Sequence, residues 1–315
     1  MASTTEAPPR KDRAPQRPGD RIFAGISTGS GVLILLALAG VAVFLVTEAW
    51  PSLTAPAEDI PGGEGLALYI WPLLFGTLIS AVLALVIAVP LAVAIALFIT
   101  HYAPRSIAKA LGYVIDLLAA VPSIIFGLWG INVLAPVTVD PTTWLSEHLG
   151  WIPFFAGPAS STGRTMLVAI IVLAVMVLPI ITAVVREAFT QTPKLHEEAA
   201  LAIGSTRWEM IRMAALPFAR SSIIGASMLG LGRALGETMA VAMVLSASGG
   251  VSFNLISSEN PPTIAANIAL QFPESSGIAI NTLIASGLVL FAITLVVNMI
   301  ARAVINRRKD FSGAN

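Results

Sequence analysis

Two charged side chains interrupt an otherwise apolar stretch of the chain. Arg233 and Glu237 stand four residues apart within residues 223–246. A charge at the centre of a bilayer costs about 2.5–3.5 kcal/mol on insertion scales, so such side chains normally face protein or water. On a continuous helix this spacing places both on one face, where they can neutralise each other. The pair is therefore either an internal structural ion pair or the lining of a path for an anion.

The second interpretation gives each neighbouring residue a role. The guanidinium of Arg233 would attract the anion, because its fork of donors suits an oxyanion. Glu237 would hold or gate the anion, with Thr238 beside it in the path. Gly232 and Gly236 form a small-x-x-x-small pair on an adjacent strip, which lets another helix approach closely. We predict helix packing there, as at a seam between subunits.

A polar segment, residues 190–220, precedes that stretch. Thr192 followed by Pro193 predicts an N-cap with Pro at the first helical position. Gly204 is a good C-terminal breaker and predicts the end of this helix.

A second short helix is expected directly after it. Thr206 and Glu209 have capping-box spacing, and Leu216-Pro217 would end the helix. Two short helices joined at a glycine would make a compact protruding knob. The alternative is an amphipathic linker that lies on the lipid headgroups, and composition does not separate the two.

Motifs for covalent chemistry are missing. The sequence has no G-x-x-x-x-G-K-[ST] loop to cradle ATP phosphates, no H-E-x-x-H and no G-x-S-x-G. It has no cysteine, which excludes thiolate metal sites, iron–sulfur ligation and thiol catalysis. His101, His148 and His196 fall in predicted loops or membrane edges, and we expect solvated or interfacial side chains rather than metal ligands. We predict a chain that is not an enzyme and binds no metal or cofactor.

Composition places these segments in a membrane protein. Of the 315 residues, 56% are hydrophobic and 11% are charged, against about 25% charged in a typical soluble domain. The zero net charge gives no basic footprint for nucleic acid. Six stretches reach the roughly 20 apolar residues that a span needs, without the alternation of a barrel strand. We predict an all-α membrane protein with spans at about 22–46, 69–99, 107–134, 165–189, 223–246 and 278–305.

Orientation follows from the basic residues. They gather before the first span, after the second, in 190–220 and at the C-terminus, while the loops 47–68, 135–164 and 247–277 hold only Arg164. The positive-inside rule places both termini and residues 190–220 in the cytoplasm. We expect a disordered cytoplasmic tail at 1–21, a six-span transmembrane domain at 22–306 and a cytoplasmic tail at 307–315. A cleaved signal peptide at 22–46 is disfavoured, because the apolar run exceeds a signal core.

A recognisable motif lies in the polar segment. Glu198-Ala199-Ala200, then Gly204 and Leu216-Pro217, resembles the EAA motif of ABC importer permeases, E-A-A-x3-G-x9-I-x-L-P. The spacing matches at every element, and the one departure is Ala214, where the motif usually has Ile. The resemblance implies a type I importer permease of MetI-like architecture. It also implies that these residues form the coupling loop that docks on a separate ATPase.

Two longer stretches resemble the PstC family of phosphate-specific ABC transporter permeases. They are residues 228–241 in the fifth span and 116–130 in the third, where Asp116 replaces the usual Glu. Met239 after Thr238 favours this family over the sister permeases, the PstA family. The resemblance implies four partners besides the lipid bilayer: a PstA-like permease, a PstB-like ATPase dimer that holds ATP and Mg, a PstS-like extracytoplasmic binding protein, and phosphate.

Physical chemistry adds a constraint to that implied role. Phosphate carries between one and two negative charges near neutral pH, so its path needs a compensating cation and a wet cavity. Arg233 is the basic residue deepest within a predicted span. The open alternatives are a permease for another oxyanion, such as sulfate or molybdate, and a proton-coupled secondary transporter.

Overall fold

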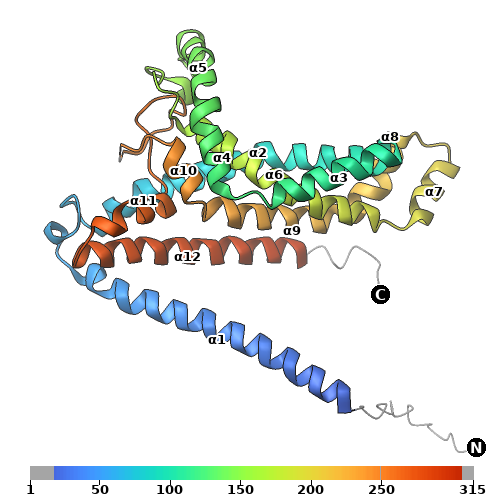
Figure 1. Ribbon diagram of the computed structural model, residues 1–315, viewed down its shortest axis with the longest axis horizontal. Helices are drawn as coiled ribbons and strands as arrows, with labels where there is room; N and C mark the ends of the chain where they lie inside the picture. Colours follow the sequence, from blue (N-terminus) through green and yellow to red (C-terminus); the bar gives the residue numbers. More distant parts are fainter. Residues whose placement is uncertain (1–17, 249, 307–315) are drawn as a thin grey trace, which may run out of the picture. The chain divides into compact units, whose positions relative to one another are not determined.

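The computed structural model describes residues 18–248 and 250–306, with nothing stated of the side chains of 304–306. Within these residues the chain is helical, and the β pairing is one isolated bridge between Ala247 and Asn260, as Figure 1 shows. The predicted all-α fold is confirmed. The helices are α1 (Pro18–Thr54), α2 (Leu66–Leu97), α3 (Arg105–Ala119), α4 (Ser123–Trp129), α5 (Ala135–Leu149), α6 (Met166–Thr190), α7 (Lys194–Ala202), α8 (Arg207–Met210), α9 (Leu216–Leu235), α10 (Met239–Val244), α11 (Ile264–Gln271) and α12 (Ile278–Asn306).

Short turns of other helical types join several of these. Three are π-helical, η2 (Phe98–Tyr102), η3 (Gly130–Leu134) and η5 (Ile211–Ala215), and three are 3₁₀, η1 (Ala57–Asp59), η4 (Pro153–Phe155) and η6 (Phe272–Glu274). Six helical runs among the described residues are long and apolar enough to cross a membrane, as predicted.

The chain divides into two compact units, residues 1–47 and 48–315. In the first unit, α1 exposes apolar side chains such as Phe23, Leu35 and Phe44 all along its length. A helix that is apolar on every face is covered by lipid or by other helices. The predicted disordered tail at 1–21 is wrong for residues 18–21, which are helical; residues 1–17 and the predicted tail at 307–315 lie outside the described residues.

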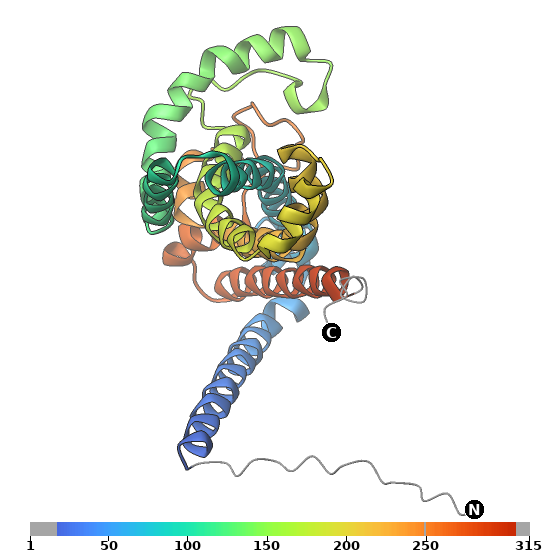
Figure 2. The same ribbon diagram turned by 90° about the vertical axis from the view of Figure 1, so that its right-hand side faces the viewer.

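The core of the second unit is a bundle of α2, α6 and α9, seen end-on in Figure 2. Five fully buried alanines on one face of α2 make this packing close, and α6 contributes the largest share of buried side chains. Helices in lipid are not driven together by the hydrophobic effect, so they associate through close packing. Small residues three or four positions apart allow it, because they let the backbones of two helices approach each other. The five fully buried alanines are Ala81, Ala84, Ala88, Ala92 and Ala96.

The predicted third span, residues 107–134, has the wrong boundaries. The chain is amphipathic α3 alongside α6, then a break, then a helical run from Ser123 to Leu149 through the predicted loop. Figure 1 shows this run leaving the bundle direction at the break. The break falls at Pro122, whose ψ of 139° is not helical. Proline has no N–H and disfavours helical backbone in the residue before it.

The predicted end of the second short helix at Leu216-Pro217 is also wrong. The helical run is continuous from Arg207 to Leu235, because the π-helical turn η5 leads directly into α9. Pro217 is the second residue of α9 and lies within this run, where it offers no N–H to the turn before it. The wider turn before it absorbs the change in bonding pattern.

Candidate translocation site and coupling loop

Arg233 lies in the last turn of α9 and is exposed within the chain. It lines a groove of about 600 Å³ between α6, α9 and α12. Arg302 of α12 lines the same groove, with the polar Asn298 one turn before it. Two guanidinium groups on one groove make its electrostatic potential positive. The sequence analysis missed Arg302 as a site residue, because it counted this residue only among the basic residues that indicate membrane orientation. The remaining lining residues are Ile180, Gly225, Met228, Leu229, Gly232 and Ala301.

Glu237 sits where the predicted fifth span is broken. α9 ends at Leu235 and α10 begins at Met239, so residues 236–238 are not helical. The Glu237 side chain is buried, and its Oε1 accepts a hydrogen bond of 3.1 Å from the backbone N–H of Ala240. The carboxylate therefore caps the start of α10, where the helix dipole favours negative charge. Thr238 donates its hydroxyl to the Gly236 carbonyl, at 3.2 Å.

The ion pair that the four-residue spacing of Arg233 and Glu237 would allow is not formed. The ion pairs within the described residues are Arg186–Asp116 and His101–Glu197. The helix break removes the geometry that the spacing of Arg233 and Glu237 requires, since one residue faces the groove and the other caps α10. Of the two interpretations of the sequence, the internal ion pair is the one that the structure contradicts.

The glycines of this region differ in what they face. A Cβ on Gly232 would meet nothing within 4 Å, and one on Gly236 would meet only the Gly232 carbonyl, at 3.6 Å. No helix of the described chain uses the predicted packing strip. Gly230, in contrast, packs tightly, because a Cβ there would lie 2.7 Å from the Ile181 side chain.

The coupling loop has the expected break but a different start. Gly204 ends the first helix with a φ of +87°, a conformation that favours glycine. Thr192 is not the N-cap: Pro193 is, and the buried Thr192 hydroxyl has no partner. The capping box between Thr206 and Glu209 is confirmed in both directions.

The motif residues divide between an outer and an inner face. Glu198 and Ala199 are exposed, whereas Ala200 is buried. α7 packs on η5, where Ile211 and Ala215 are fully buried. Ile211 thus supplies apolar volume beneath the loop close to Ala214, where the motif usually places an Ile. Exposed apolar side chains surround the outer face: Leu195, Ile203 and Trp208.

Two polar links on this side of the bundle were not foreseen. Asp116 of α3 accepts from the Arg186 guanidinium of α6 at 3.2 and 3.3 Å. His101 is only 9% exposed and contacts Glu197 of α7 at 3.3 Å, so of the two expected settings, solvated or interfacial, the solvated one is wrong there. A contact between residues 96 positions apart carries no local sequence signal. His148, which stacks on Trp144, and His196 are both exposed.

A second cavity, of about 510 Å³, lies at the other end of the bundle. Tyr69 and Asn267 line it and are joined by a 2.9 Å hydrogen bond from the Asn267 amide to the Tyr69 hydroxyl. The loop that carries Ser248 and Thr263 closes one side. Asn260 fixes this loop, because its side chain bonds to the Met166 N–H and to the carbonyls of Ser246 and Ser257, each at 3.0 Å.

The bundle and its exposed loop are those of a membrane permease, and comparison with known proteins gives the family. The model of the binding-protein-dependent transport system inner membrane components matches residues 88–310. The chain belongs to this family. It is a permease of the bacterial inner membrane that crosses the membrane several times and is not itself an enzyme.

Relatives within the family are similar over nearly the whole chain. The phosphate transport system permease protein PstC 2 of Mycobacterium tuberculosis is 44% identical over 305 residues, 93% of this chain and 94% of the relative. PstC of Mycobacterium leprae is 42% identical over 297 residues, 90% and 92% of the two chains. PstC of Mesorhizobium japonicum is 37% identical over 306 residues, 94% and 92%.

Solved structures share the fold at low identity. A chain of a bacterial alginate ABC transporter, solved with its pentasaccharide-bound periplasmic protein, has a TM-score of 0.64 at 17% identity, covering 91% of this chain and 95% of that one. A chain of the inward-facing MetNI methionine ABC transporter has a TM-score of 0.53 at 18% identity, covering 77% and 95%. The expected importer permease architecture is confirmed.

Proposed function

We propose that the chain is one permease subunit of an ATP-driven phosphate importer. The similarity to phosphate transport permeases over more than 90% of the chain carries this proposal. A groove lined by Arg233 and Arg302 supports it, because an anion needs compensating positive charge to leave water. The other groove walls are apolar, with Asn298 as the remaining polar side chain.

A second permease would complete the path. The Gly232 face of α9 is open in this chain, which suits close approach by a helix of a sister permease similar to PstA. The groove beside it would then become an enclosed path between the two subunits. An extracytoplasmic binding protein would deliver phosphate to the outer side.

The coupling loop would dock on a cytoplasmic ATPase dimer. Leu195, Ile203 and Trp208 expose apolar surface around Glu198 and Ala199, and exposed apolar patches on soluble-facing segments mark interaction sites. ATP and Mg would be held by the ATPase, and both termini of this chain would lie on the same cytoplasmic side by the positive-inside rule. ATPase closure would move the two permeases between inward- and outward-open states.

The test of the proposed function is uptake of labelled phosphate. Cells that lack this chain should take up phosphate poorly at low micromolar concentration, and the wild-type gene should restore uptake that ATP depletion abolishes. Sulfate uptake, measured in parallel, should not change. A sulfate defect with normal phosphate uptake would keep the permease and overturn the substrate.

One variant tests the path. Arg233→Gln should abolish phosphate uptake while the subunit still assembles, because the groove loses one of its two positive charges. Normal uptake by the assembled variant would remove Arg233 from the path. Protein level in the membrane and co-purification with the ATPase provide the control for assembly.

A second variant tests coupling. Gly204→Asp should leave the subunit in the membrane but separate ATP hydrolysis from transport, since a side chain at a φ of +87° strains the turn that shapes the loop. The space around Gly204 is open, so the fold beyond the loop is not overpacked. Transport at the wild-type rate would contradict the docking role.

A further inference from the structure

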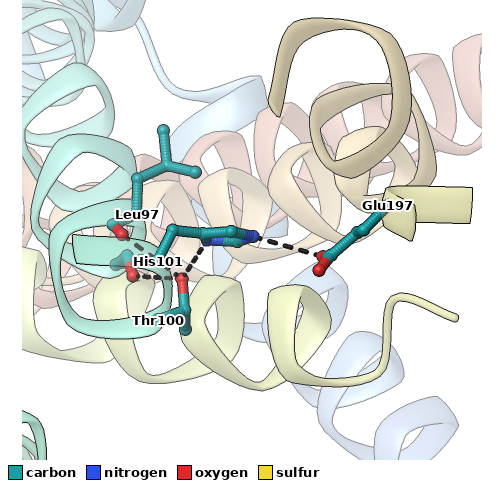
Figure 3. A network of polar contacts seen from close by, with 5 residues as sticks. Leu97, Thr100, His101 and Glu197 are labelled. Atoms are coloured by element: carbon teal, nitrogen blue, oxygen red, sulfur yellow. Dashed lines mark hydrogen bonds and ion pairs between the residues drawn. The ribbon is translucent and has the colours of Figure 1, made fainter. Parts of the chain in front are cut away.

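His101 stands where three helices meet. It lies in the π-helical turn η2 at the end of α2, and its ring contacts Phe189 at the end of α6 edge-to-face, with centroids 5.9 Å apart. Its Nε2 faces Glu197 Oε1 of α7 at 3.3 Å, as Figure 3 shows. Phe189 is buried and the His101 side chain is 9% exposed. The contact therefore ties the coupling loop to two helices of the core bundle.

Both nitrogens of the ring have hydrogen-bond partners. The Thr100 hydroxyl lies 2.8 Å from the Ala96 carbonyl and 2.7 Å from His101 Nδ1. A hydroxyl has one hydrogen, so if it donates to the carbonyl, the ring must donate from Nδ1 to Oγ1. Nε2 faces a carboxylate oxygen and needs a hydrogen as well. All three contacts are satisfied together only by the imidazolium, whose two nitrogens both donate.

A neutral ring would give up one of these contacts. With the hydrogen on Nε2, the Thr100 hydroxyl must turn to Nδ1 and leave the Ala96 carbonyl; with it on Nδ1, the Glu197 contact is lost. The Glu197 contact survives in the imidazolium and in the neutral ring with its hydrogen on Nε2, but only the imidazolium adds the attraction between opposite charges, so the link between η2 and α7 is stronger in the protonated state.

The other charged or titratable groups on the elements around the ring are not paired with it among the described residues; on α7 these groups are Lys194, His196 and Glu198, all exposed. α2 carries no charged residue. The charged residues of α6 are Arg186, paired with Asp116 of α3, and Glu187, which accepts from Gln191. α3 adds the basic residues Arg105 and Lys109, which the structure does not pair with His101. On α7, Glu197 is the carboxylate within ion-pair distance of the ring.

We propose that His101 is a positioning residue for the coupling loop, which as an imidazolium holds α7 against the ends of α2 and α6 and so makes coupling sensitive to pH. This inference rests on the coupling role proposed for the loop. Loss of the proton as pH rises would loosen α7, so that movement of the ATPase reaches the bundle less completely. ATP would then be hydrolysed with less transport.

The test uses the full complex with its sister permease, ATPases and binding protein, reconstituted in liposomes. ATP hydrolysed per phosphate transported is measured at steps from about pH 5 to 8. In the wild type this ratio should rise with pH. In His101→Leu it should be about threefold to tenfold above the wild-type value at low pH and independent of pH, as expected for loss of one such contact.

Two further variants separate positioning from simple loss of packing. Glu197→Gln should match His101→Leu, and the double variant should be no worse than either single one, because both remove the same interaction. His101→Gln retains one neutral donor and should give a ratio near the wild-type value but without its pH dependence. If His101→Leu does not assemble, His101→Gln decides: a pH profile like that of the wild type would overturn the proposal.

His148→Gln is the matched control, since this exposed histidine stacks on Trp144 in α5, away from α7. It should follow the wild type at every pH. If the effects of His101→Leu and Glu197→Gln add up in the double variant, the proposal would also be contradicted.

Backbone hydrogen exchange of α7 in the same complexes gives a readout that needs no phosphate. Exchange should be faster in His101→Leu than in the wild type, and unchanged exchange would overturn the role of His101. A wild-type complex that fails to transport phosphate would refute the proposed function, while the exchange result would still decide on His101.

Discussion

Glu237 offers a test that separates a structural role from a role in transport. Its carboxylate accepts one hydrogen bond of 3.1 Å from the Ala240 N–H and is 8% exposed. Glu237→Gln keeps an oxygen in place for this bond and removes the charge, whereas Glu237→Ala removes both. Glu237→Gln therefore keeps the hydrogen bond at the start of α10 without its charge, whereas Glu237→Ala removes the hydrogen bond altogether.

The structure sets the expected magnitudes. A hydrogen bond to a charged group contributes about 1.5–3 kcal/mol, so Glu237→Ala should lose about 2 kcal/mol of stability. For a unit of this size that lowers the Tm by roughly 4–8 °C. Glu237→Gln should lose about 1 kcal/mol or less, the part that comes from the charge at the start of a helix.

Thermal unfolding of the purified complex measures the loss of stability, and phosphate uptake measures the effect of the charge on transport. If the Glu237 charge moderates attraction of the anion, Glu237→Gln should lower both the half-saturating phosphate concentration and the maximal rate, since the anion is held more tightly and released more slowly. Equal destabilisation by Gln and Ala would refute the capping role. Wild-type uptake by Glu237→Gln would refute a role of the charge in the path.

Two other positions test the packing at the end of the bundle that carries Tyr69 and Asn267. Asn260→Leu should cost about 3–5 kcal/mol, because two buried hydrogen bonds and one partly buried one are lost and their backbone partners stay unsatisfied. A similar change at exposed Asn132 should cost less than about 1 kcal/mol, and equal Tm values would contradict the assignment. Gly76→Ala should cost about 1–3 kcal/mol because the new methyl group would overlap the Pro262 carbonyl oxygen. Gly232→Ala, where the space is open, should not lower the Tm of the isolated subunit.

Hydropathy predicted the number of membrane-crossing helices because burial in lipid depends on length and composition alone. It placed α6 and α12 within a residue or two, since Thr165 and Gly277 mark their starts. It misplaced the third span, because an apolar run hides the break at Pro122. The effect of Pro217 depends on the turn before it, and a π-helical turn has no simple sequence signature.

The candidate site was predicted less completely than the fold. Arg233 and Glu237 stood out because charges in apolar stretches are costly, but their spacing suggested a contact that the helix break removes. Arg302 and His101 gained their meaning only from neighbours distant in sequence. The capping box and Gly204 were recognisable because their signals are local.

If the loop at residues 190–220 docks on an ATPase as proposed, α9 would act as a lever beyond the π-helical turn η5. At a rise of 1.5 Å per residue, Leu216 and Arg233 lie about 26 Å apart along its axis. A rigid tilt of about 5° at the loop end would move the far end by about 2 Å. The π-helical turn stands just before this arm and Gly236 just after it, and both are points where a helix can pivot. Small rotations at the loop would thus open or close a passage for an ion at the far end.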